Sequence, residues 1–482
     1  MIWDAVVIGS GVGGLACAAA LAAKGRKVVI LEQGASPGGY LVSFRRGQFI
    51  FDAAVDCFAG LDPGGVFTWL LNSLGIDEEI RRIRIDPIHV SLFPGLNVRV
   101  DACLGEYVNR LCRLFPAERK GIVEHFRCAG EIYDDFELLT QLVLEEGGGG
   151  PRMPSIIGRY RDLTFSAFLE QNIKDRRVAA ILSDRCPFLG LSPRRVSAVR
   201  MVLLVMSYFR SGAFRTAGGH QRLPDILVEG IRRKGGEFLP RKAAKKIIVE
   251  GGRCTRVITE DGEEFPAWHV VSNADHYETM HRLLGKSELT TRRDAEGAHG
   301  ISPSFFILYA AVSGDLSPPE GASSIGAFHT FDLDSLLDGY IPFRQTEPLG
   351  ITIPTVEDPS LAPEGHHVVI VHELIPHGYQ VDWGRDKRVL AEKLLQKAER
   401  VLPGLSGRIV HFEAATPETL ARYTRNRDGA AFGWEQTPTL PRVRHGIPNL
   451  HLAGHWTEVG GGVLAAAYSG VRAAARVVEA TG

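Results

Sequence analysis

The first forty residues most constrain what this chain can fold into. Residues Asp4–Ile8 are mostly apolar and predict a buried strand, and a glycine-rich turn follows directly. An alanine-rich segment over 15–23 then predicts a helix, and residues 27–31 predict a second strand that ends at Glu32. Strand, glycine turn, helix, strand and terminal acid in this order predict a βαβ unit of the kind that binds dinucleotides.

The turn has the spacing G-x-G-x-x-G, and each glycine has a mechanical role. Gly9 permits the tight turn, Gly11 lets the backbone approach a diphosphate, and Gly14 lets helix and strand pack closely. Val12 and Gly13 complete the predicted diphosphate loop. The helix N-terminus adds unpaired N–H groups and a partial positive charge, which favour binding of the diphosphate.

The residues after the second strand indicate which dinucleotide binds. Glu32 is placed to accept hydrogen bonds from ribose hydroxyls, and its negative charge disfavours a 2′-phosphate. Gln33 follows it, and a second glycine pair stands at Gly38 and Gly39. This run resembles the extended fingerprint of flavin oxidoreductases, in which the glycine pair lies beside the diphosphate of FAD. Many relatives have arginine where this chain has Tyr40. The resemblance favours FAD over NAD.

The composition fits a globular protein and gives no electrostatic reason to bind nucleic acid. Of the 482 residues, 45% are hydrophobic and 23% are charged, and the formal net charge is -1. This length predicts two or three structural units. Seven scattered cysteines without a C-x-x-C pair argue against a disulfide scaffold or a zinc site and indicate a reducing compartment. Because the first strand begins by about residue 4, we expect no signal peptide and predict a cytoplasmic protein.

One predicted helix, over residues 194–210, is unusually apolar. Its segment Met201–Phe209 is too short to span a bilayer. Three positions stay open for it: an ordinary core helix, a helix in a membrane interface, or the lining of an apolar tunnel in which methionines adapt to substrate. The second position implies peripheral contact with the inner membrane face.

Two other motifs are rejected as functional sites. His372 and His377 flank a segment that is nearly H-E-x-x-H, but the second histidine is one residue too far and Pro376 would break the required helix. The run Gly147–Gly150 follows two glutamates and no strand, so we predict a loop there. We therefore predict no metal site and no second dinucleotide site.

A second strand–glycine–helix arrangement closes the chain. Residues 449–454 predict a strand that ends at Gly454, and the glycines at 460–462 open a predicted helix over 463–478. A helix N-terminus after a glycine turn is suited to an anion or to developing negative charge. In flavoproteins with this layout, that helix end faces N1 and O2 of the flavin.

Three regions, 9–39, 218–275 and 449–470, together resemble the FAD proteins that include phytoene desaturase, carotenoid isomerase and retinol saturase, within the wider fold of monoamine oxidase. The resemblance covers roughly half of the chain and implies an α/β fold in two domains. The implied Rossmann-type FAD-binding domain is discontinuous and comprises residues 1–85, 215–285 and 415–482. The inserted α+β substrate domain comprises residues 86–214 and 286–414.

The resemblance also implies roles for single residues. Ala244 falls where the backbone meets adenine, and Gly454 matches the glycine of an A-G-D pattern whose acid is replaced here by His455. The start of the last helix would lie at the isoalloxazine, with contacts from Gly461, Gly462 and Val463. Phe432 and Trp434 would form walls for an apolar substrate beside the flavin. The candidates for catalysis are His220, Trp434, His455 and Glu458.

These implications predict an FAD-dependent oxidoreductase that acts on carbon–carbon double bonds of an apolar polyene or isoprenoid. Desaturation, saturation and cis–trans isomerisation stay open, and so does the electron partner: oxygen, a quinone or an external reductase. A flavin amine oxidase is one alternative. A non-catalytic prenyl or lipid carrier of the GDP-dissociation-inhibitor type is another, and it would not need the glycine loop, Glu32 or the last helix start.

Overall fold

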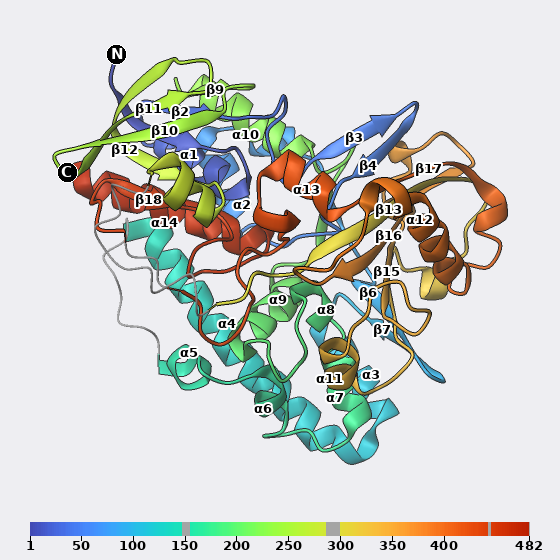
Figure 1. The fold of residues 1–482 in the computed structure, drawn as a ribbon. Coiled ribbons are helices and arrows are strands. Elements are labelled where there is room, and N and C mark those ends of the chain that lie inside the picture. The colour runs from blue at the N-terminus through green and yellow to red at the C-terminus, as the bar shows by residue number, and fades with distance from the viewer. Residues whose placement is uncertain (147–154, 286–298, 442–444, 482) are drawn as a thin grey trace.

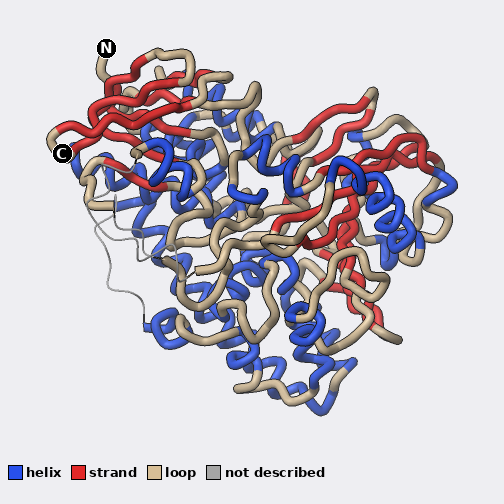
Figure 2. The backbone as a smooth tube through the Cα atoms, viewed as in Figure 1, coloured by secondary structure: helices blue, strands red, loops and turns tan. Residues whose placement is uncertain are grey.

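The computed structural model describes residues 1–146, 155–285, 299–441 and 445–481, and the predicted loop at 147–150 lies outside these ranges. Two sheets lie on opposite sides of the molecule, and a lobe made of helices extends below them (Figure 1). Figure 2 shows the same division by element type, with strands gathered in two groups.

The first sheet has seven strands in the order β10-β11-β12-β1-β2-β9, with β18 beside β12. Its centre is parallel: β1 (Trp3–Ile8) pairs with β2 (Val28–Leu31) and with β12 (Glu264–Ser272). The other strands are β9 (Glu237–Leu239), β10 (Ala244–Glu250), β11 (Arg253–Thr259) and β18 (Leu450–Leu452). Distant segments thus bring their carboxyl ends to one edge, which is where open α/β sheets bind ligands.

Helices rich in small residues cover this sheet. α1 (Val12–Ala23) is buried along nearly its whole length and packs closely against the C-terminal helix α14 (Val463–Thr481). The approach is so close that a Cβ on Gly470 would lie 2.0 Å from the carbonyl oxygen of Gly13. The helices packed beside α1 are α2 (Val66–Leu74) and α10 (Arg222–Arg233).

The second sheet also has seven strands, in the order β17-β13-β16-β15-β14-β6-β7. Its strands are β6 (His89–Phe93), β7 (Leu96–Val100), β13 (Ser304–Ser313), β14 (Ser324–Ala327), β15 (Leu349–Thr352), β16 (His366–Ile375) and β17 (Ile409–Ala415). α12 (Trp383–Glu399) buries Trp383 and Leu394 against strand residues such as Phe306. The hairpin of β3 (Ser43–Arg46) and β4 (Phe49–Asp52) packs Phe51 against Ile307.

The helical lobe holds the largest apolar cluster of the molecule. Its helices are α3 (Leu104–Leu114), α4 (Arg119–Glu146), α5 (Ser155–Tyr160), α6 (Phe165–Leu169), α7 (Arg176–Leu182), α8 (Cys186–Leu189) and α9 (Ala198–Arg210). The Ser197 hydroxyl caps α9 by accepting a hydrogen bond from the backbone N–H of Arg200. The remaining elements are β5 (Arg82–Arg84), β8 (Phe214–Thr216), α11 (Leu333–Asp338) and α13 (Pro417–Thr424).

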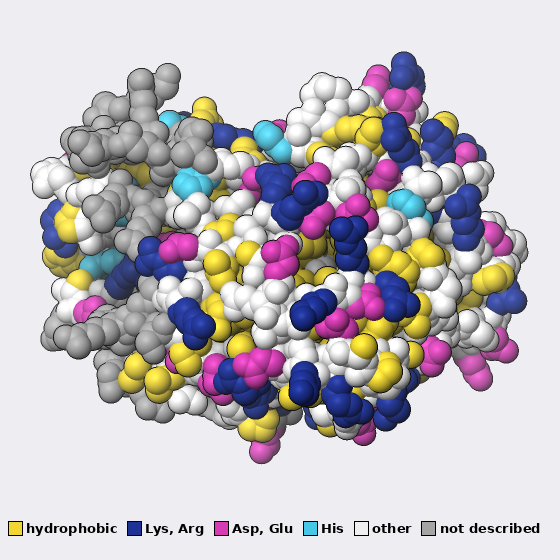
Figure 3. All heavy atoms as spheres, turned by 90° about the horizontal axis from the view of Figure 1, so that it is seen from below, with side chains coloured by type: hydrophobic (Ala, Val, Ile, Leu, Met, Phe, Trp, Pro, Cys, Tyr) yellow, Lys and Arg dark blue, Asp and Glu magenta, His cyan; other side chains and the backbone are white. Residues whose placement is uncertain are grey.

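Helix α9 is the apolar segment singled out in the sequence. Met201 and Met206 are buried in the lobe, whereas Leu203 and Leu204 line a cavity described below. Among the residues that the structure describes, no helix is both long and apolar enough to cross a membrane. On the face seen in Figure 3, hydrophobic side chains form small groups between charged side chains of both signs.

Candidate active site

An elongated cavity of about 240 Å³ runs along the carboxyl edge of the first sheet. It extends from the end of β2 to the start of α14, and it is closed on one side by the second sheet. The structure brings most of the predicted cofactor residues together around it: Gly9, Gly11, Val12, Gly13, Glu32, Gln33, Gly38, Gly39, Ala244, Gly454, His455, Gly462 and Val463.

The glycine loop leaves no room for side chains. A Cβ on Gly11 would lie 2.8 Å from the side-chain Nδ2 of Asn273, and a Cβ on Gly13 would lie 2.5 Å from the backbone nitrogen of Gly454. Gly14 does not line the cavity, but a Cβ there would lie 2.1 Å from the carbonyl oxygen of Gly9. The loop backbone is therefore held open to the cavity, as close approach by a diphosphate requires.

Glu32 is held rigidly at one end of this cavity. Its Oε2 accepts hydrogen bonds from the backbone N–H of Ser10 at 2.8 Å and from the Ser10 hydroxyl at 2.6 Å. Its Oε1 accepts a hydrogen bond from the backbone N–H of Gly34 at 2.7 Å. An acid fixed beside Ala244, at the end of β2, fits the ribose end of the flavin dinucleotide that the sequence implies.

The other end of the cavity carries a neutral imidazole. His455 follows β18, and its Nε2 lies 3.2 Å from the Asn426 Oδ1, which also accepts a hydrogen bond from the Trp456 indole N–H at 2.9 Å. Burial lowers the pKa of His455 to about 4, so the ring is uncharged at neutral pH. Position 455 thus holds an uncharged ring in place of an acid. It therefore does not neutralise the partial positive charge at the N-terminus of α14, which begins at Val463.

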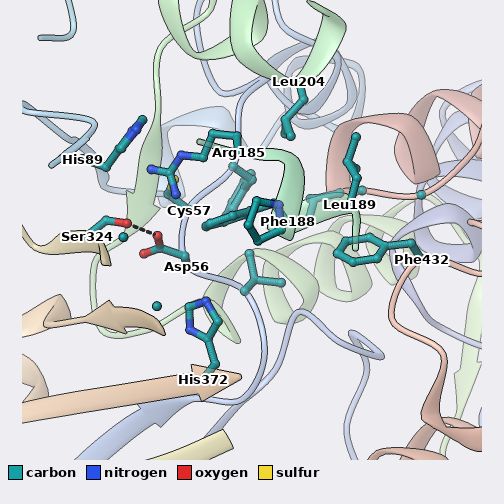
Figure 4. A pocket seen from close by; sticks show the side chains of 18 of the residues that line it. Asp56, Cys57, His89, Arg185, Phe188, Leu189, Leu204, Ser324, His372 and Phe432 are labelled. Carbon is teal, nitrogen blue, oxygen red and sulfur yellow. Dashed lines mark hydrogen bonds between the residues drawn. The ribbon is translucent and has the colours of Figure 1, made fainter. Parts of the chain in front are cut away.

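A second cavity of about 260 Å³ lies between the second sheet and helices α8 and α9 (Figure 4). Much of its wall is apolar, with side chains contributed by Phe188, Leu189, Leu203, Leu204, Phe305, Phe328 and Leu349. Such a wall suits an extended hydrocarbon and excludes water.

The two cavities share one wall. The residues that line both are Ala54, Val55, Phe305, Ile307, Phe432, Gly462 and Val463. The rings of Phe305 and Phe432 meet edge to face, with centroids 6.1 Å apart. Since Gly462 and Val463 form the start of α14, a molecule in the second cavity would lie against the end of the first cavity that this helix faces.

One side of the second cavity is polar. Asp56 forms an ion pair with Arg215 at 2.7 Å and accepts a hydrogen bond from the Ser324 hydroxyl at 2.6 Å. Burial alone would raise the pKa of Asp56, but the Arg215 guanidinium and this hydrogen bond lower it below its usual value. Asp184 lies 2.7 Å from the Nε2 of His89, and Ser91 donates to the same carboxylate oxygen at 2.5 Å. Both carboxylates are therefore charged, and both already interact with neighbouring side chains.

His372 is a titratable side chain close to the shared wall. It lies on β16, directly opposite Ile307 of β13 in the strand ladder, and its ring centroid lies 5.7 Å from that of Phe305. Burial lowers its pKa to about 4. Gly350 provides the space for the imidazole, because a Cβ there would lie 2.1 Å from Nε2.

Three of the catalytic candidates line neither of the two cavities. Trp434 is buried against Trp456 and donates its indole N–H to that residue's carbonyl at 3.2 Å. His220 is buried outside both cavities, where its Nε2 lies 3.1 Å from the carbonyl oxygen of Asp56. Glu458 points away, toward Arg472 at 3.4 Å.

Gly461 also differs from its expected position, because it lines the second cavity and not the first. Sequence reasoning missed Asn273, which lines the first cavity, and Asp56 and Arg185, which line the second. It considered His372 only in the rejected H-E-x-x-H-like segment. Asn273 had a usable signal, since it directly follows parallel strand β12 at the ligand-binding edge of the sheet. Asp56 and Arg185 belong to no motif. Within the described ranges, no group of three or more His, Cys, Asp or Glu side chains is arranged to hold a metal ion.

Comparison with known proteins agrees with this geometry. A family model described as "Flavin containing amine oxidoreductase" matches residues 12–478. The chain is 30% identical to a chloroplastic prolycopene isomerase of Daucus carota, over all of this chain and 80% of that protein. It is 26% identical to an all-trans-retinol 13,14-reductase of Macaca fascicularis, over 94% of this chain and 82% of the relative.

A bacterial relative and a solved structure extend the comparison. The neurosporene-forming phytoene desaturase of Rhodobacter capsulatus is 26% identical, over 99% of this chain and 94% of that protein. A putrescine oxidase structure matches with a TM-score of 0.64 over 99% of both chains at 14% identity, which shows a shared fold.

Proposed function

Since the chain belongs to the family of flavin-containing amine oxidoreductases, we propose that it is an FAD-dependent oxidoreductase acting on a carbon–carbon double bond of an apolar polyene or isoprenoid. The wall shared by the two cavities carries this proposal, because it sets an extended apolar space directly against the cofactor space. The isomerase, reductase and desaturase relatives support it, since their names describe reactions of polyenes.

The residues of the first cavity fit FAD. The loop at Gly9–Gly13 and the pair Gly38 and Gly39 would hold the diphosphate, Glu32 the ribose, and Ala244 the adenine. The start of α14 would face the isoalloxazine. When bound, the flavin supplies hydride or electron transfer at the substrate double bond.

The chain's own residues position the substrate and keep water out. The reacting double bond would lie against the first cavity, in contact with Phe305, Ile307 and Phe432. The apolar wall would bind the rest of the substrate. We assign His372 to proton transfer, because its uncharged ring lies opposite Ile307 and lines the substrate cavity. A neutral imidazole can accept a proton from the carbon next to the one that loses hydride, as desaturation requires. In saturation, the protonated ring would donate its proton to the carbon next to the one that gains hydride.

The domain division and the location of the protein belong to the same proposal. The first sheet takes its strands from residues 3–31, 237–272 and 450–452, and the second takes its strands from 89–100 and 304–415. These segments support an FAD domain of residues 1–85, 215–285 and 415–482, with the remainder as a substrate domain. Seven free cysteines support a cytoplasmic location, and peripheral membrane contact would give access to an apolar substrate.

An anaerobic assay tests the proposed function. The purified protein is examined for a flavin spectrum and then mixed, oxidised or reduced, with an extract of mixed polyenes. Loss of two hydrogens with the oxidised form identifies a desaturase, and gain of two with the reduced form identifies a saturase. An isomer shift without a mass change identifies an isomerase. Oxidation of putrescine instead would identify an amine oxidase, and a colourless protein that cannot be loaded with FAD would identify a carrier.

A further inference from the structure

Arg185 is a buried cation in the wall of the substrate cavity. It immediately precedes α8 and is 4% exposed. Its guanidinium packs over the ring of Phe188, with 4.3 Å between Cζ and the ring centroid. Figure 4 shows the guanidinium turned toward the side of the cavity that carries His89 and Asp56, away from Phe432.

The guanidinium of Arg185 has donors that no described residue accepts. Its Nε and Nη2 are buried and have no hydrogen-bond partner among the described residues. The two nearby carboxylates are taken by other groups, Asp56 by Arg215 and Asp184 by His89. The charge of Arg185 is close enough to help lower the pKa of both carboxylic acids. The third nitrogen, Nη1, also has no hydrogen-bond partner among the described residues and is not fully enclosed. Because buried donors without acceptors are costly, an acceptor in the cavity would bind to this guanidinium.

We propose that Arg185 binds an oxygen atom of the substrate, so that the substrate is an oxygenated polyene or isoprenoid and not a pure hydrocarbon. This inference rests on the proposed function and narrows its substrate class. A hydrocarbon chain would fill the apolar part of the cavity but would leave the donors of Arg185 without partners. A hydroxyl or carbonyl oxygen would satisfy them.

The surrounding charge favours a neutral oxygen over a carboxylate. The polar side already contains the carboxylates of Asp52, Asp56 and Asp184, against the two guanidinium groups of Arg185 and Arg215. The neighbouring imidazoles add no positive charge at neutral pH, because burial lowers the pKa of both His89 and His372. An added anion would therefore enter a group that is already negative, whereas a hydroxyl or carbonyl group adds no charge.

Matched substrates test this inference. One pair is lycopene and its derivative with a terminal hydroxyl, and a second pair is all-trans-retinol and its deoxy hydrocarbon. Binding is followed anaerobically as a change in the flavin spectrum, and kcat/KM is measured for each compound. The variants are Arg185→Met, which removes the donors, and Arg185→Lys, which keeps the charge without the fork. Arg195→Met, at an exposed ion pair with Glu435, is the control.

We expect the wild-type protein to prefer the hydroxylated member of at least one pair by about 10- to 100-fold in kcat/KM. Arg185→Met should lose this preference because kcat/KM falls for the hydroxylated compound and stays unchanged for the hydrocarbon. Arg185→Lys should retain part of the preference, and Arg195→Met should keep all of it.

Equal use of both members by the wild-type protein would overturn the inference and leave the proposed function standing, whether or not the variants fold. So would an equal loss for both members in Arg185→Met with the flavin still bound, since that result would show a purely structural charge. Failure of every polyene to perturb the flavin or to be converted would overturn the proposed function as well.

Discussion

The two cavities are built in opposite ways. The cofactor cavity is shaped by backbone and by missing side chains, since Gly11 and Gly13 have no space for a Cβ. The substrate cavity is shaped by large side chains from α8, α9 and five strands of the second sheet. Larger side chains in the glycine loop should therefore disrupt folding and flavin binding. Changes of polarity or shape in the substrate cavity should alter substrate use with the flavin still bound.

Gly14→Val should have the largest effect. Its Cβ would lie 2.1 Å from the carbonyl oxygen of Gly9, so β1 and α1 would have to separate. We expect a loss of about 3 kcal/mol or more of unfolding free energy and little bound flavin, measured by thermal unfolding and visible absorbance. Gly158→Ala, in α5 with open space around it, is the control and should be neutral or slightly stabilising. A stable, yellow Gly14→Val protein would contradict the comparison.

Glu32→Ala should weaken flavin binding without unfolding the protein. The substitution removes the hydrogen bonds that the carboxylate accepts from Ser10 and Gly34, and it removes the acceptor for the ribose hydroxyls. Charged hydrogen bonds of this kind contribute about 1.5–3 kcal/mol, so we expect the Kd for FAD to rise about 10- to 100-fold. Titration of the apoprotein measures this. Glu229→Ala, on the exposed side of α10, should leave the Kd unchanged.

Leu204→Asp tests the substrate cavity. An unpaired carboxylate in an apolar wall disfavours a hydrocarbon chain, so kcat/KM for a polyene should fall about 10-fold or more while flavin content stays constant. Leu138→Asp, at an exposed position of α4, serves as the control. Equal loss of flavin in Leu204→Asp would show that the two cavities are not separable.

Low pH should decrease the free energy of unfolding through one histidine in each cavity, and by a similar amount for each. His372 and His455 each have a pKa of about 4 in the folded protein, below the ordinary value of about 6.5 in the unfolded chain. Between these values the unfolded chain binds more protons, so stability falls as the pH falls, by about 1 kcal/mol per histidine at pH 5.5. Urea unfolding of His372→Phe and His455→Phe at pH 7 and 5.5 should show a smaller pH dependence than wild type.

Trp434→Phe should have the smallest effect. It removes the hydrogen bond to the Trp456 carbonyl, which contributes about 1 kcal/mol, and leaves both cavities untouched. We expect a small decrease in melting temperature with unchanged kcat, KM and flavin spectrum. A large change in the spectrum would restore the role first expected for this residue.

The same contrast explains what the sequence could predict. The glycine loop, Glu32 and the start of α14 were predictable because each depends on a few consecutive residues whose conformation is set locally. Arg185, Asp56 and His372 meet only after α8, the segment after β4 and strand β16 come together, so their spacing in sequence carries no signal. Trp434 was misplaced because Gly433 has a φ of +71°. That conformation breaks the regular alternation after Phe432 and turns the indole away from the cavities.

The close packing of α1 against α14 has a consequence for the order of events in the cell. The loop at Gly9–Gly13 is synthesised long before Gly454, Gly462 and Gly470, which complete its cavity and cover its helix. The nucleotide site of a nascent chain is therefore incomplete until α14 has been synthesised. Removal of α14 should leave a polypeptide that cannot hold the flavin.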